Sequence, residues 1–206
     1  MIKNTVLKAL LAGMLIGVGC VVYLNLKPVN GIVAAIAFSI ALVSIVALEL
    51  NLYTGKVGYV VYSNKKNIVD NIADLFLILS CNMTGVMIVS ILCYNETIHL
   101  VATELCLQKT SKSIFRLIAD SFMCGVLMFI AVESYKKTKL FIPVIMCVAT
   151  FILCGFEHSI AYMGYFLLGT SSVVTLSVVF LMILFNGVGS IVAASLYKGV
   201  QNGKTN

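Results

Sequence analysis

An acid and a histidine stand side by side within a long apolar stretch, in the run Gly155-Phe156-Glu157-His158-Ser159. An imidazole changes its charge between about pH 5 and pH 8, so it can donate a hydrogen bond to an anion or lend it a proton. Burial favours the neutral imidazole, whereas an arriving anion favours the charged form. Both roles therefore stay open: a neutral donor, or a proton carrier that lets a weak-acid anion pass as the neutral acid.

The same pair could serve an intramembrane enzyme as general acid and base. Adjacent residues on a helix point about 100° apart, however, and no nucleophile or metal-ligand set accompanies Glu157 and His158. His99 is the only other histidine, and the seven cysteines form no Cys-x-x-Cys pair. We therefore expect no metal, no cofactor and no enzymatic activity.

A second polar interruption lies in an earlier apolar stretch, at residues 49–56. The two stretches that carry the interruptions, 30–62 and 140–169, are long for membrane spans. At about 1.5 Å per residue, a continuous helix over the first would rise about 48 Å, beyond a hydrocarbon core of about 30 Å. Broken helices persist at membrane depth only where the freed backbone groups are buried in protein or line a cavity. The sequence therefore predicts two broken helices that face a pathway.

The composition places the whole chain in a membrane. Its 206 residues are 61% hydrophobic and 11% charged, whereas soluble domains carry about a quarter charged residues. Six stretches are apolar and long enough to span a bilayer, at about 5–26, 30–62, 72–95, 116–135, 140–169 and 172–197. The sequence predicts an all-α integral membrane protein of six spans, with the lipid bilayer as its partner and no nucleic acid.

The basic residues divide between the two faces of such a protein. One face collects Lys3, Lys8, Lys65, Lys66, Lys136, Lys137, Lys139, Lys198 and Lys204. The other has Lys27, Lys109, Lys112 and Arg116, in loops that also hold Glu96, Glu104 and Cys106. The richer face is expected on the cytoplasmic side of the cell membrane, which places both termini in the cytoplasm.

The two halves of the chain match each other in outline. The broken stretches are the second of the first three spans and the second of the last three. The third and sixth spans each contain Asn-x-x-Gly, at Asn82–Gly85 and Asn186–Gly189. We expect one domain over residues 1–206, built from inverted repeats at about 5–95 and 114–198, with binding where the broken helices meet.

The interruptions also carry a resemblance. The string Gly155-Phe-Glu-His-Ser-Ile-Ala-x-Met163 and the segment Leu52-Tyr-Thr-Gly55 resemble motifs of the formate/nitrite transporter family. The similarity extends to Ala12-Gly13, Ile16-Gly17 and the run Cys124–Val132. It implies an aquaporin-like protomer, a homopentamer with one pore per protomer, and passive passage of small monovalent anions. Formate is the first candidate, and nitrite or hydrosulfide are the alternatives.

The resemblance implies a role for each candidate residue. His158 corresponds to the central pore histidine, Thr54 to its hydrogen-bond partner, and Glu157 to the adjacent acid, tied to backbone amides of the restarted helix. The residues expected at two apolar constrictions are Phe38, Leu42, Leu52, Tyr53 and Phe151. Lys109 falls at the outer vestibule, where it and Lys112 would concentrate anions. Apolar rings would then strip water from them.

The chain departs from the family pattern at several polar positions. Tyr162 and Gly125 stand where many members have asparagine, and Asn51 replaces an acid. These changes make the pore less polar and give hydrosulfide some weight. Asp120 is expected to pair with Arg116, one helical turn earlier. A membrane sensor or scaffold without flux remains the further alternative.

Overall fold

The computed structural model describes residues 2–63, 68–170 and 173–203, and throughout these ranges the regular elements are helices. Within these residues, four helices are long and apolar enough to cross a membrane. They are α1 (Ile2–Leu26), α5 (Ile68–Leu92), α7 (Ile114–Thr138) and α10 (Val173–Gly203). The predicted all-α membrane class is confirmed.

The two long stretches are broken into shorter helices, as their length and polar interruptions predict. The first contains α2 (Gly31–Phe38), α3 (Ile40–Ala47), α4 (Tyr53–Lys56) and the 3₁₀ helix η1 (Val57–Tyr62). The second contains α8 (Ile142–Leu153) and α9 (Ser159–Leu168). The first stretch has a further interruption at Ser39, whose hydroxyl donates to the carbonyl of Ile36. Such bonding back onto the preceding turn bends helices.

A helix also forms where the sequence analysis expected a loop, between the third and fourth spans. It is α6 (Glu96–Thr110), and it contains both Cys106 and Lys109. Asn95 caps its start by accepting the backbone N–H of Ile98, as asparagine commonly does. The loop assignment was wrong because a helix of 15 residues with several charged side chains is shorter and more polar than a membrane span.

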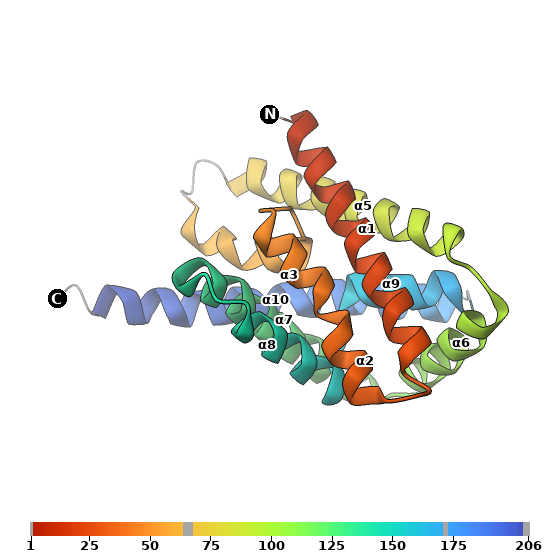
Figure 1. The fold of residues 1–206 in the computed structure, drawn as a ribbon. Coiled ribbons are helices and arrows are strands. Elements are labelled where there is room, and N and C mark those ends of the chain that lie inside the picture. The colour runs from red at the N-terminus through yellow and green to blue at the C-terminus, as the bar shows by residue number, and fades with distance from the viewer. Residues whose placement is uncertain (1, 64–67, 171–172, 204–206) are drawn as a thin grey trace.

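Two pairs of long helices pack closely, α1 against α5 and α7 against α10. A side chain at Gly13 would collide with the backbone of Asn82, and one at Gly125 with the backbone of Asn186. Glycine at these crossings therefore lets the helix backbones touch. The broken segments α2–α3 and α8 lie beside each other, and α10 extends past the rest of the chain at its C-terminal end (Figure 1).

Both breaks end their first helix in the same way. Glu49 follows α3 with φ 52°, and Gly155 follows α8 with φ 72°. The next amide then reaches back five residues, from Leu50 to Ile45 and from Phe156 to Phe151, each at 2.9 Å. This is the left-handed helix end that glycine favours and that a glutamate adopts at a steric cost.

Candidate functional site

Two buried asparagine side chains hold the breaks in place. The amide of Asn82 in α5 accepts from Tyr53 N at 2.8 Å and donates to the carbonyls of Asn51 and Ala9 at 2.9 and 2.7 Å. Because the freed backbone groups are paired this way, the chain can leave and re-enter the helix without orphaned polar atoms.

Asn186 in α10 does the same at the second break. Its amide accepts from Ser159 N at 2.8 Å and donates to the carbonyls of Glu157 and Ser121 at 2.7 and 2.8 Å. These are the asparagines of the repeated Asn-x-x-Gly pattern. The pattern therefore marks the two side chains whose hydrogen bonds fix where α4 and α9 begin.

The breaks held by these two asparagines bring His158 and Thr54 together, as the resemblance implies. His158 Nε2 lies 2.9 Å from Thr54 Oγ1, and both side chains are buried. The other ring nitrogen, Nδ1, accepts the backbone N–H of Ala161 at 3.1 Å and thereby caps α9. Since Nδ1 is an acceptor, the neutral ring carries its proton on Nε2 and donates it to the threonine oxygen.

Four of the five predicted constriction residues are buried and form two groups. Phe38, Leu42, Leu52 and Phe151 are each at most 4% exposed. The Phe151 ring stacks on the imidazole of His158 with centroids 5.6 Å apart, and it meets Phe38 edge-on at 6.1 Å. Leu42 and Leu52 line a different cavity from the one that Phe151 lines. Phe151 and Phe38 therefore form an apolar group at His158, and Leu42 and Leu52 form a second one in the wall of the other cavity, where Leu52 precedes α4 and Thr54.

Tyr53 does not join them. Its hydroxyl donates to the carbonyl of Ile183 at 3.3 Å, and its side chain lines an apolar groove between α5 and α10. The structure thus separates Tyr53 from the other four predicted residues.

Glu157 lies at the centre of a charged cluster beside the break. Its buried carboxylate pairs with Lys109 through one oxygen and with Lys112 at 2.6 Å through the other. The expectation that this carboxylate accepts from backbone amides of α9 was wrong: its partners are the two lysine ammonium groups. The backbone N–H of Glu157 itself donates to the carbonyl of Asp120 at 3.2 Å.

Lys112 makes more contacts than its expected role as a vestibule charge requires. Its ammonium also donates to Asp120 Oδ2 at 2.7 Å and to the carbonyl of Gly155 at 2.8 Å. Burial by itself would lower the pKa of Lys112, but the carboxylates of Glu157 and Asp120 outweigh it and raise that pKa. The predicted pair between Arg116 and Asp120 is confirmed at 2.9 Å. Spacing along the chain could reveal this i,i+4 pair but not the contacts of Lys112 across the break.

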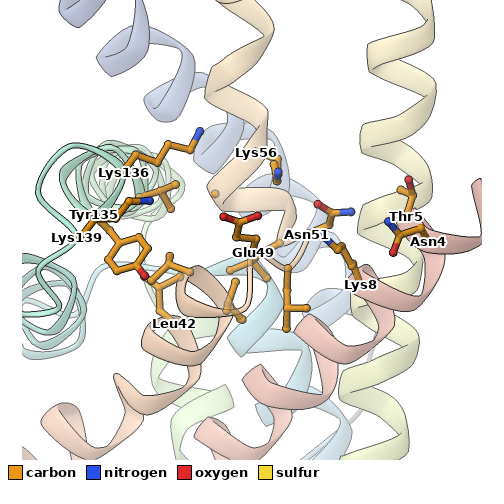
Figure 2. Close-up of a pocket in the computed structure, with 16 residues that line it drawn as sticks. Asn4, Thr5, Lys8, Leu42, Glu49, Asn51, Lys56, Tyr135, Lys136 and Lys139 are labelled. Carbon is orange, nitrogen blue, oxygen red and sulfur yellow. The ribbon is translucent and has the colours of Figure 1, made fainter. Parts of the chain in front are cut away.

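The site opens into a cavity at each end of α1. The smaller, about 40 Å³, is lined by Lys109, Glu157, His158, Phe151 and Tyr162 among others. Lys109 Nζ lies 5.8 Å from the centre of the Tyr162 ring. The larger, about 420 Å³, lies near the start of α1 and has several lysines in its wall (Figure 2). Among the residues that the structure describes, no three His, Cys, Asp or Glu side chains are grouped to hold a metal ion.

This arrangement is that of a helical membrane transport protein: broken helices meeting at a buried polar pair, with a cavity on either side. A sequence model of the Formate/nitrite transporter family matches residues 1–202. The chain belongs to that family. No curated protein matches it in sequence.

Solved structures with the same fold are distant in sequence. An "FNT family ion channel" superposes with a TM-score of 0.80 at 20% identity, over 99% of this chain and 90% of that one. A "Pentameric formate channel with formate bound" gives 0.76 at 20% identity, over 99% and 97%. At this identity the likeness establishes the fold.

Proposed function

We propose that the protein is a passive channel for small monovalent anions of weak acids, with formate as the first candidate. The observation that carries this proposal is the His158–Thr54 pair, buried at 2.9 Å beside the two apolar groups. A hydrogen-bonding pair at the centre of a dry passage offers an anion a partner at the point where the cost of leaving water is greatest.

Charge at the smaller cavity supports anion passage from that side. The cluster of Lys109, Lys112, Arg116, Glu157 and Asp120 has three cations and two anions, so it retains one positive charge. Lys109 is the cation of this cluster that lines the cavity. It raises the local anion concentration beside the Phe38–Phe151 group, while Glu157 holds its ammonium in place.

The size of this cavity favours small anions. About 40 Å³ has room for about three waters, which suits the three heavy atoms of formate or nitrite or the single one of hydrosulfide. Tyr162 places an aromatic ring in the wall, and Gly125 lies against α10 rather than offering an amide. Nitrite and hydrosulfide therefore remain the alternatives within the proposal.

His158 acts in this proposal chiefly as a neutral donor. To become imidazolium, the ring must be protonated at Nδ1, which already accepts the Ala161 N–H. Protonation would break that cap and put a positive charge at the N-terminus of α9, where the helix dipole opposes it. A proton-lending cycle is the competing mechanism, and it requires the cap to open in each cycle.

The inverted repeat is also part of the proposal. The two breaks correspond in their hydrogen bonds and in their backbone conformation. Asn82 accepts from Tyr53 N as Asn186 accepts from Ser159 N, and the residues with positive φ are Glu49 in one break and Gly155 in the other. This correspondence supports repeats at about 5–95 and 114–198 within a single domain of residues 1–206.

Assembly and orientation complete the proposal. The pentameric formate channel that shares this fold supports a homopentamer with a pore in each protomer. The surplus of lysines at the end that holds the start of α1 supports cytoplasmic termini. We place the protein in the cell membrane.

The test is formate uptake by liposomes that carry the wild type or His158→Asn, measured between about pH 5 and pH 8. Asparagine can still cap α9, so the variant should fold. We expect slower uptake in the variant and a similar pH profile, because a hydrogen-bond donor is weakened but no titrating carrier is lost. A profile that flattens in the variant would support proton lending instead, and wild-type uptake no faster than in empty liposomes would refute the channel.

A further inference from the structure

The larger cavity is built unlike the smaller one. It measures about 420 Å³, against about 40 Å³ at the other end of the site. Its wall comes from the start of α1, the first break and the end of α7, and Leu42 and Leu52 lie in it. An anion of one to three heavy atoms needs no such volume, whereas pockets of about 300–1,000 Å³ are typical for organic ligands.

The lining carries a concentrated positive charge. Lys8, Lys56, Lys136 and Lys139 contribute to it, and Glu49 is the acid among its residues. In Figure 2, Glu49 lies between Lys136 and Lys139 on one side and Lys8 on the other. Four cations against one anion leave a net charge of about +3 in the wall of one cavity.

These lysines are not neutralised as the outer ones are. Among the described residues, no ion pair within 4.0 Å involves Lys8, Lys56, Lys139 or Glu49. Lys56 is close enough to interact electrostatically with both Lys8 and Glu49. Lys136 interacts in the same way with Lys56, with Lys139 and with the carboxylate of Glu133, which lies outside the cavity lining. The ammonium groups therefore face a shared space, and their mutual repulsion would be relieved by a multiply charged anion.

Lys136 is also held in position by its surroundings. Its ammonium lies 3.4 Å from the centre of the Tyr59 ring, and the Tyr59 hydroxyl donates to Glu133 at 2.7 Å. The cation–π contact orients the ammonium without neutralising it. This lysine is thus presented at a fixed point of the wall.

The backbone adds an independent observation. In the described part of the chain, the non-glycine residues with positive φ are Glu49 at 52° and Lys139 at 59°. Both line this cavity. Each of these residues ends a helix, Glu49 after α3 and Lys139 after α7, in the left-handed conformation that is common at helix ends. The two helix ends therefore bring one carboxylate and one ammonium to the wall of the same cavity.

We propose that this cavity is a binding site for a multivalent phosphate-bearing anion, which regulates flux from the end of the protein where α1 begins. Ammonium groups are point charges that suit phosphate oxygens, and a cavity with four of them favours two or more phosphoryl groups over a monovalent anion. The regulatory part rests on the proposed function. A bound anion would lie over the apolar group of Leu42 and Leu52 and reduce the access of transported anions to it.

Binding is tested with inorganic pyrophosphate and the purified protein in detergent, by the shift of its thermal unfolding midpoint at constant ionic strength. The site variant is Lys8→Gln/Lys56→Gln. The control, Lys3→Gln/Lys137→Gln, removes the same charge from exposed positions at the same end of the protein, outside the cavity lining. If the site variant does not fold, Lys139→Gln takes its place.

We expect pyrophosphate to stabilise the wild type and the control equally. In the site variant the apparent Kd should rise by about fivefold per lysine, or about 25-fold in all. No stabilisation of the wild type, or the same affinity in both double variants, would overturn the site. This measurement needs no transport, so it stands even if the proposed function fails.

Regulation is tested by formate uptake into liposomes of neutral lipid, with pyrophosphate on both sides, or with a phosphorylated inositol lipid in place of pyrophosphate. Lysine-dependent slowing by pyrophosphate identifies a soluble anion as the ligand. Slowing by the lipid alone identifies a headgroup as the source of the same chemistry. Unchanged uptake in both arms, from wild type that binds pyrophosphate and transports formate, would overturn the regulatory role.

Discussion

Replacing Lys112 by methionine removes one ammonium that serves three oxygens. Its partners are Glu157 Oε1 at 2.6 Å, Asp120 Oδ2 at 2.7 Å and the carbonyl of Gly155 at 2.8 Å. The carboxylates of Glu157 and Asp120 are 0% and 2% exposed, so water cannot replace the ammonium partner that the substitution removes. Breaking a buried ion pair costs about 3–5 kcal/mol. Each carboxylate keeps one cation and Lys112 is 23% exposed, so we expect the lower end, about 3 kcal/mol.

The assay is unfolding in mixed micelles by a denaturing detergent, followed by circular dichroism and compared with Lys137→Met. Lys137 lies 3.9 Å from Glu133, and its side chain is 56% exposed. Loss of such a surface pair should cost no more than about 1 kcal/mol. The reasoning fails if the two variants unfold within about 1 kcal/mol of each other, because the cluster beside the break would then contribute no more than a surface pair.

The remaining predictions concern the pH dependence of the cluster, the pore pair and the two helix ends. The pKa of Lys112 is raised above its usual 10.5 in the folded protein. The ammonium's contribution to stability is therefore complete below pH 10.5 and is lost as the pH rises through the higher folded-state pKa. The difference in free energy of unfolding between wild type and Lys112→Met should stay constant up to about pH 10 and shrink above it. Thr54→Val should lower the free energy of unfolding by about 1–3 kcal/mol, because the buried Nε2–H of His158 loses its acceptor, and Thr54→Ser should restore most of it in the same assay. Gly155→Ala should destabilise by about 1–2 kcal/mol, because alanine would have to adopt φ 72°, whereas Glu49→Gly should be neutral or stabilising at the corresponding position; equal losses in these two variants would contradict the strain argument.

Much of the architecture was available from local chemistry. Apolar length predicted the spans, and the polar residues around Glu49 and Glu157 predicted where two of them break. The approach of His158 to Thr54 followed from the family resemblance. The distance of 2.9 Å between them is now an observation, while their role in transport is a proposal.

The rest depends on contacts that a single sequence does not specify. Asn82 and Asn186 attracted notice as a repeated pattern, but their amides act across the fold, on residues up to 73 positions away. Lys112 meets Glu157 across 45 residues, and its interpretation as a vestibule charge missed the bridge it forms. Tyr53 was predicted at a constriction because it follows Leu52 in the chain. Successive residues at a helix start point in different directions, and its side chain turns towards α10 instead.

The most direct test of the central claim is uptake of formate, nitrite, hydrosulfide and acetate into liposomes that carry the purified protein, measured against empty liposomes. The proposal predicts accelerated uptake of one or more of the first three anions, saturating only at high concentration, with acetate slower because it adds a methyl group in a cavity of about 40 Å³. No acceleration for any of the four, from protein shown to be folded, would contradict the channel and leave a membrane sensor or scaffold as the alternative.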